Sequence, residues 1–336
     1  PVVINGTSKL VYELHLTNFS QTPFTLKCVS VLEQSIATQI MKVCDEALSK
    51  RLSLKTEDQR TINPAMHAVV YLEVENALEK MPEALKHRIE YKNKTSEDSD
   101  FVEGSEVVIQ KEPILVLETP LAGGPWAAIY EPSWERGHRR VFYATDGHAH
   151  LPGRFAIDFI KLDDQGRYSN GNEDQISNWY GHGIDVLAVA DARVVSIRDN
   201  IQESKTISGN PKHKLEDGAG NYIVLDLGNG YFAFYEHLKP GSILVKSGDH
   251  VSTGQKIASL GFTGDSTGPH LHFHLADHNS TLASEGLPYH FKSFTVLGSY
   301  DSLNDFGKKL WKPINDSSDP VRKMEFPAPN VVVRFK

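Results

Sequence analysis

The chain has 336 residues, enough for two domains that each bury a core of their own. Its 35 basic and 43 acidic residues leave a net charge of −8, which argues against a nucleic-acid binder that must neutralise phosphates. No apolar stretch approaches the ~20 residues that a membrane-spanning helix needs, so we expect no transmembrane segment.

The first 120 residues read as a small all-β domain of unknown role. Residues 10–17 alternate apolar and polar side chains, as a half-buried strand does, and residues 18–22 read as a turn. Strands joined by turns, with little helix, indicate a β-sandwich over residues 1–120. Cys28 and Cys44 lie in apolar surroundings, which is compatible with a disulfide or with two buried thiols. Further strands are predicted at 24–32, 68–74 and 106–117, a short helix at 36–48 and a polar loop at 92–99.

A Pro/Gly cluster at residues 120–125 marks the expected domain boundary. We assign residues 121–153 to a linker and lead-in, 154–287 to a glycine-rich antiparallel β domain, and 288–336 to a tail that packs back onto that domain. The dipeptide Asn229-Gly230 predicts a hairpin. Strands are expected at 155–162, 186–197, 222–227, 232–237, 256–260 and 270–275. The polar insertions at 163–183 and 199–220 are expected to be either functional rims or disordered segments that flank the histidines.

Three histidines occupy alternate positions in an apolar run, at His270, His272 and His274. A period of two is strand geometry, so the three imidazoles should project from one face of a strand. Neutral imidazole is the commonest protein ligand for zinc, and alternate strand positions can aim two rings at one point. We therefore favour a metal site over the alternative of a polar outer face that happens to carry histidine.

The region around these histidines resembles a known family. It presents, in order, Tyr235-Glu236-His237-Leu238, Gly248-Asp249, Gly254-Gln255, Gly261-Phe262-Thr263-Gly264 and Gly268-Pro269-His270-Leu271-His272-Phe273. This succession resembles the lysostaphin/LytM-type zinc metallopeptidases, whose domain is a glycine-rich antiparallel β fold with an open groove. The likeness covers about residues 154–276, and its motifs are specific in order, spacing and turn residues.

The resemblance implies a set of functional residues and a substrate. Asp158 and His272 would be ligands of a zinc ion, and His237 and His270 would be catalytic histidines beside the metal-bound water. The substrate implied is the peptide cross-link of peptidoglycan, and the location implied is secreted, periplasmic or cell-envelope. The sequence starts at Pro1 without an initiator Met, which is compatible with a removed export signal.

One residue departs from the family pattern. Four residues before Asp158, where the family has its first histidine ligand, this chain has Arg154, whose guanidinium has no lone pair for a metal. Arg154 could pair with Asp158 in place of zinc, another histidine could complete the set, or Asp158 and His272 could hold metal weakly with extra waters. His274 is the preferred substitute because it shares a strand face with His272; weaker candidates are His148, His150 and His182.

Two functions follow from these observations. The leading hypothesis is a zinc-dependent metalloendopeptidase that cleaves peptidoglycan cross-links, because Asp158, His237, His270 and His272 are all present. The alternative, motivated by Arg154, is a catalytically degenerate module that binds cell wall or a partner protein without cutting.

Overall fold

The computed structural model describes residues 1–54, 59–75, 81–93, 99–111, 113–134, 137–315 and 319–336. The chain is mainly β and divides into two compact units, Pro1–Ile114 and Leu115–Lys336. None of the helices in the described ranges is long and apolar enough to cross a membrane.

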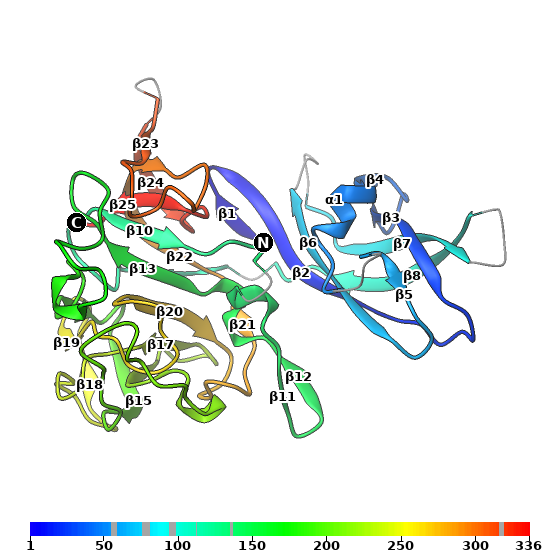
Figure 1. The fold of residues 1–336 in the computed structure, drawn as a ribbon. Coiled ribbons are helices and arrows are strands. Elements are labelled where there is room, and N and C mark those ends of the chain that lie inside the picture. The colour runs from blue at the N-terminus through cyan, green and yellow to red at the C-terminus, as the bar shows by residue number, and fades with distance from the viewer. Residues whose placement is uncertain (55–58, 76–80, 94–98, 112, 135–136, 316–318) are drawn as a thin grey trace. The chain divides into compact units, whose positions relative to one another are not determined.

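In its described residues, unit 1 has two antiparallel sheets and one short helix (Figure 1). One sheet has the strand order β1-β2-β6, and the other has the order β4-β3-β7-β8 with β5 paired to β3. The elements are β1 (Val2–Ile4), β2 (Thr7–Thr17), β3 (Phe24–Glu33), β4 (Gln39–Cys44), α1 (Asp45–Ser49), β5 (Thr61–Ile62), β6 (His67–Glu75), β7 (Ala84–Asn93) and β8 (Ser99–Val108).

The two sheets of unit 1 share one hydrophobic core. Leu14 on β2, Val29 on β3 and Ile89 on β7 belong to the same buried cluster, as the alternation of apolar and polar residues in these strands requires. Of the loop predicted at residues 92–99, residues 94–98 lie outside the described ranges.

The helix predicted over residues 36–48 is wrong for most of its length. Residues Gln39–Cys44 form β4, which pairs with β3, and the helix is reduced to the five residues of α1. Cys28 and Cys44 face each other across β3 and β4 and form a disulfide, which decides between the two states that the sequence left open. Pairing with a neighbouring strand has overridden a helical spacing of apolar residues, because strand partners are invisible to a local pattern.

Unit 2 is built on one large sheet (Figure 1). Its strand order is β18-β15-β16-β17-β20-β13-β10-β25-β22-β23, with β21 on β20 and with β9 and β24 on β22, and two small sheets pair β11 with β12 and β14 with β19. The strands are β9 (Leu115–Leu117), β10 (Trp126–Ile129), β11 (Tyr143–Thr145), β12 (His148–His150), β13 (Ile157–Lys161), β14 (Asp185–Leu187), β15 (Ala192–Arg198), β16 (Tyr222–Asp226), β17 (Phe232–Glu236), β18 (His250–Val251), β19 (Lys256–Ser259), β20 (Leu271–Ala276), β21 (Gly286–Leu287), β22 (Tyr289–Ser299), β23 (Lys312–Pro313), β24 (Val321–Glu325) and β25 (Val331–Arg334). The short 3-10 helices in the described part of unit 2 are η1 (His138–Arg140), η2 (Pro152–Phe155), η3 (Ile176–Asn178) and η4 (Leu215–Asp217).

The middle of this sheet joins segments that are far apart in the chain. β10, from the residues assigned to a linker, is buried throughout and pairs with β13 on one side and β25 on the other. β22 and β24, from the C-terminal residues, continue the same sheet beyond β25. As predicted, β16 and β17 form a hairpin through Asn229-Gly230, and both turn residues have positive φ.

Candidate active site

Asp158 lies at the centre of a cluster of histidines. Its Oδ1 atom is 2.9 Å from Nδ1 of His272 and 3.3 Å from Nε2 of His270. Its Oδ2 atom is 3.1 Å from Nε2 of His138. The side chain of Asp158 is 20% exposed, and that of His272 is 12% exposed. Imidazoles from different segments of the chain therefore converge on one half-buried carboxylate.

Strand register explains the meeting of Asp158 and His272. β13 and β20 are antiparallel neighbours, and Asp158 lies directly opposite His272, so the two side chains leave the sheet on the same face. His270 precedes β20, after a turn at Gly268 that packs against the indole of Trp179 so closely that a Cβ there would overlap the ring. Glycine is needed at this turn because any larger residue would push it, and His270 with it, away from the sheet.

His138 is the member of the cluster that sequence reasoning missed. It opens the 3-10 helix η1, in the residues assigned to a linker. η1 packs against η2, and a Cβ at Gly153 would lie only 2.8 Å from the backbone oxygen of His138, so glycine permits this close approach. No spacing rule links His138 to Asp158, because the contact depends on the folding of two separate short helices. Its signal in the sequence was that of an isolated histidine.

The residues around Asp158 fit a zinc ion. Ligand atoms of His138, Asp158 and His272 all lie within 4.8 Å of one another. Two imidazole nitrogens and one carboxylate oxygen are a donor set that catalytic zinc uses, with the fourth position kept for water or substrate. His138 thus offers a nitrogen where Arg154, at the position of the family's first ligand, offers none.

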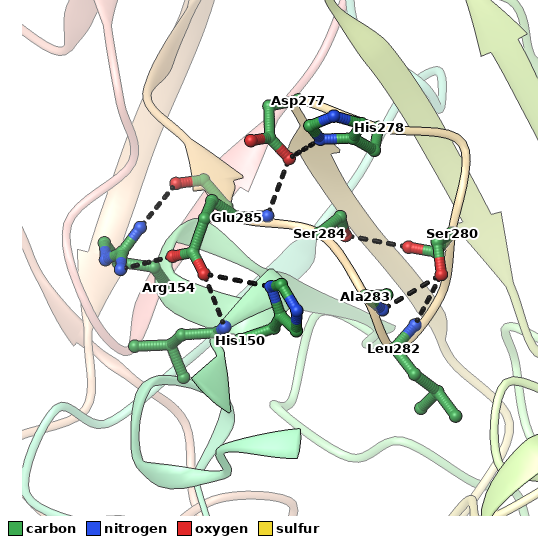
Figure 2. Close-up of polar contacts among 11 residues, drawn as sticks. His150, Arg154, Asp277, His278, Ser280, Leu282, Ala283, Ser284 and Glu285 are labelled. Carbon is green, nitrogen blue, oxygen red and sulfur yellow. Dashed lines mark hydrogen bonds and ion pairs between the residues drawn. The ribbon is translucent and has the colours of Figure 1, made fainter. Parts of the chain in front are cut away.

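Arg154 does not pair with Asp158. Its Nη2 atom lies 2.7 Å from Oε2 of Glu285, and its Nη1 atom donates to the backbone oxygen of Gly286 at 3.2 Å (Figure 2). Oε1 of the same glutamate accepts from the backbone N–H of Leu151 and lies 3.5 Å from Nδ1 of His150. Of the three arrangements that the sequence left open, the one in which Arg154 pairs with Asp158 is therefore contradicted. Through its ion pair with Glu285, Arg154 instead links the segment before β13 to the segment before β21.

The structure places the predicted substitute ligands away from Asp158. His274 stacks on Phe234, with ring centroids 4.6 Å apart, and groups with Glu236 and His272 as a second set of metal donors. Burial raises the pKa of Glu236 to about 8, with Asp158 adding to the shift. The weaker candidates also lie elsewhere: His182 is 2.7 Å from Glu203, His150 is beside Glu285, and His148 is exposed on β12.

His237 and His270 each present one ring nitrogen to the cavity. Nδ1 of His237 donates to the backbone oxygen of Thr263 at 2.8 Å, and Nδ1 of His270 donates to that of Gly268 at 2.7 Å. Because a carbonyl oxygen can only accept, these bonds place a proton on Nδ1 and direct Nε2 toward the site. The two rings are 4.7 Å apart between centroids. His237 has a φ of +62°, a strained conformation for a non-glycine residue that is often found at functional sites.

Burial and neighbouring charges set the protonation of these groups. Burial by itself would raise the pKa of Asp158, but His138 and His270 hold that pKa well below its usual range. Burial also opposes the charged form of His270, yet Asp158 raises the pKa of this imidazole. Burial, followed by the charges of His270 and His272, lowers the pKa of His237 well below its usual value. The pKa of His237 is thus shifted down and that of His270 is shifted up.

The histidine cluster opens into a cavity of about 340 Å³. The insertion at residues 199–220 forms part of its wall through Leu215, Gly218 and Ala219, as expected of a rim. Among the described residues that line the cavity, none is Lys or Arg. The remaining lining residues are Trp134, Gly137, His138, Val141, Tyr143, Pro152, Gly153, Asp158, Glu236, His237, Asp265, Thr267, His270, His272, His274, Thr281 and Leu282.

Comparison with known proteins finds relatives for part of unit 2. Residues 176–283 match the sequence model of Peptidase family M23. The peptidoglycan DD-endopeptidase ShyA of Vibrio cholerae is 54% identical over 57 residues, which are 17% of this chain and 13% of ShyA. The peptidoglycan DD-endopeptidase ShyB of the same organism is 39% identical over 97 residues, which are 29% of this chain and 18% of ShyB.

The aligned regions are short compared with the relatives, since they span less than a fifth of either one. Among solved structures, the catalytic domain of lysostaphin from Staphylococcus simulans aligns with 44% of this chain and 85% of its own length, at 24% identity and a TM-score of 0.26. His237, His270 and His272 lie inside the matched residues, whereas His138 and Asp158 precede them. Residues 176–283 are thus a Peptidase family M23 domain.

Proposed function

We propose that unit 2 is a zinc-dependent endopeptidase that hydrolyses peptide cross-links of peptidoglycan. The observation that carries this proposal is the convergence of His138, Asp158 and His272, a three-ligand zinc set, beside two further imidazoles. The names of the relatives ShyA and ShyB support peptidoglycan as the substrate. The same substrate implies action in the cell envelope or outside the cell.

The protein's own residues would divide the work as follows. His138, Asp158 and His272 would hold zinc, which supplies polarisation of the scissile carbonyl and activation of water when bound. Nε2 of His237 is set up to take a proton, because burial keeps this imidazole neutral and its Nδ1–H is already bonded to Thr263.

His270 would have the complementary role. Asp158 favours its protonated form, so its Nε2–H can stabilise negative charge on the carbonyl oxygen or return a proton to the leaving amine. The hydrogen bond from its Nδ1 to Gly268 holds the ring in place for this transfer. The two imidazoles lie 4.7 Å apart between centroids and have pKa values shifted in opposite directions, so His237 would act as the base and His270 as the acid.

The cavity is suited to an uncharged or cationic peptide. Asp265 is the lining carboxylate left without a counter-charge, because Asp158 would hold zinc, Glu236 has a pKa raised to about 8 by burial, and none of the described lining residues is Lys or Arg. An extended peptide with small residues or a free amino group would fit this wall better than an acidic one.

Hydrolysis of purified peptidoglycan by the full chain tests the proposal. The expected result is conversion of cross-linked dimeric fragments into monomers, with zinc in the purified protein and loss of conversion in an Asp158→Asn variant. Absence of zinc from the protein, together with no cleavage after zinc is added, would count against it.

The alternative function is a binding module without peptidase activity. Its motive was Arg154. The pairing of Arg154 with Glu285 and the position of His138 beside Asp158 support the peptidase over this alternative. Binding of peptidoglycan that persists under a chelator, with no cleavage under any metal, would favour this alternative.

A further inference from the structure

A second group of metal donors lies in the same cavity. Ligand atoms of Glu236, His272 and His274 are within 4.8 Å of one another. Glu236 is 7% exposed and His274 is 2% exposed, so this group is buried more completely than the one that contains His138. His272 belongs to both groups.

His274 is in an unusual state for a buried polar side chain. Neither Nδ1 nor Nε2 has a hydrogen-bond partner among the described residues. Its ring stacks on that of Phe234, with 8° between the planes. Packing therefore holds the ring in place but gives neither nitrogen a hydrogen-bond partner. Buried polar atoms are nearly always paired, and an unpaired one needs an explanation such as an ion.

Strand register builds this second group as it builds the first. β17 and β20 are antiparallel, with Glu236 opposite His272 and Phe234 opposite His274. Residues that alternate along paired strands share one face, so the carboxylate and both imidazoles project to the same side of the sheet. A carboxylate with two imidazoles is again a donor set that suits zinc.

We propose that Glu236, His272 and His274 form a second, alternative binding position for a divalent transition metal. A neutral imidazole has one lone pair, so His272 can serve one of the two positions at a time. The metal in the second position would be removed from Asp158 and His138, and the peptidase would be idle in that state. The site itself does not depend on peptidase activity, whereas its inhibitory effect rests on the proposed function.

A variant without His138 distinguishes the two metal positions, because only the first position loses a ligand. In a His138→Ala variant of the full chain, zinc should stay bound, with weaker affinity than in the wild type, because the second position keeps its three donors. Anomalous scattering from crystals of this variant should place the ion among Glu236, His272 and His274. Affinity would be measured by competition with a chromophoric chelator.

A second substitution in that background tests the donors. His138→Ala/His274→Phe keeps an aromatic ring on Phe234 but removes both nitrogens, and zinc affinity should fall by roughly 100-fold, the share of one ligand in a zinc site. The matched control is His138→Ala/His250→Phe, which alters an exposed histidine on β18 and should bind zinc as His138→Ala does. If the His274 variant does not fold, His138→Ala/Glu236→Gln tests the same position with an isosteric change.

The possible outcomes separate this inference from the proposed function. Zinc bound to the wild type but lost from His138→Ala would overturn the second position and leave the peptidase proposal standing. Equal zinc affinity in His138→Ala and His138→Ala/His274→Phe would also overturn it, because His274 would then contribute nothing. A wild-type protein that binds no zinc would remove both proposals.

Discussion

The candidate site has two halves: the residues of one lie inside the segment that matches Peptidase family M23, and those of the other lie before it. His237, His270 and His272 lie within the residues that match Peptidase family M23, on or beside the neighbouring strands β17 and β20. His138 and Asp158 lie before the matched residues, and one comes from a 3-10 helix while the other comes from a strand. The first half keeps the order of motifs on which the resemblance rests, whereas in the second half the imidazole beside Asp158 comes from His138 and not from the position that holds Arg154. A group of potential metal donors thus depends on where the donor atoms lie in space more than on their spacing along the chain.

Removal of the metal should have the largest effect, because it disables both halves at once. Dialysis against a chelator should lower hydrolysis of cross-linked peptidoglycan fragments to background, and stoichiometric zinc should restore it. Zinc content by atomic emission, measured beside activity, checks the result. Full activity in protein shown to be free of metal would refute a zinc mechanism.

His138→Ala should have the next largest effect. It tests the half of the site that contains His138 and Asp158. Loss of this ligand displaces the metal from Asp158, and kcat/KM for peptidoglycan fragments should fall by roughly 10³-fold or more. His148→Ala, which alters an exposed histidine of β12, is the control and should keep wild-type activity. An active His138→Ala enzyme would mean that Asp158 and His272 suffice.

His237→Ala tests the other half, and its effect should be smaller. Removal of a general base typically costs a factor of roughly 10²–10⁴ in kcat, and we expect a value near 10², because His270 and the metal ligands remain. Zinc affinity should stay at the wild-type value, which separates this variant from His138→Ala. Loss of zinc in His237→Ala would assign the residue to the metal instead.

Arg154→Ala should have the smallest effect on activity and should act on stability. The half-buried pair with Glu285 joins the segments around β13 and β21, and its loss should lower the free energy of unfolding by about 1–2 kcal/mol. Thermal unfolding measures this change, and hydrolysis should stay within about threefold of the wild type.

A double-mutant cycle gives the control for Arg154. Glu285→Ala should destabilise by a similar amount, and the double variant should cost less than the sum of the two single changes, because the residues share one interaction. A collapse of activity in Arg154→Ala, with stability unchanged, would instead place Arg154 in the catalytic site.

The sequence by itself determined the mainly β class, because alternation along strands and glycine-rich turns are local signals. The expectation that Asp158, His237, His270 and His272 share one site came from the resemblance of the motifs to a known family, not from a local pattern. Only the tertiary structure decided which further potential metal donor lies beside Asp158. His138 reaches Asp158 through the packing of η1 on η2, and Arg154 turns to Glu285, neither of which has a sequence period. The same holds for β4, where a strand partner outweighed a helical pattern. Local patterns report the faces of an element, but contacts between separate segments depend on the whole fold.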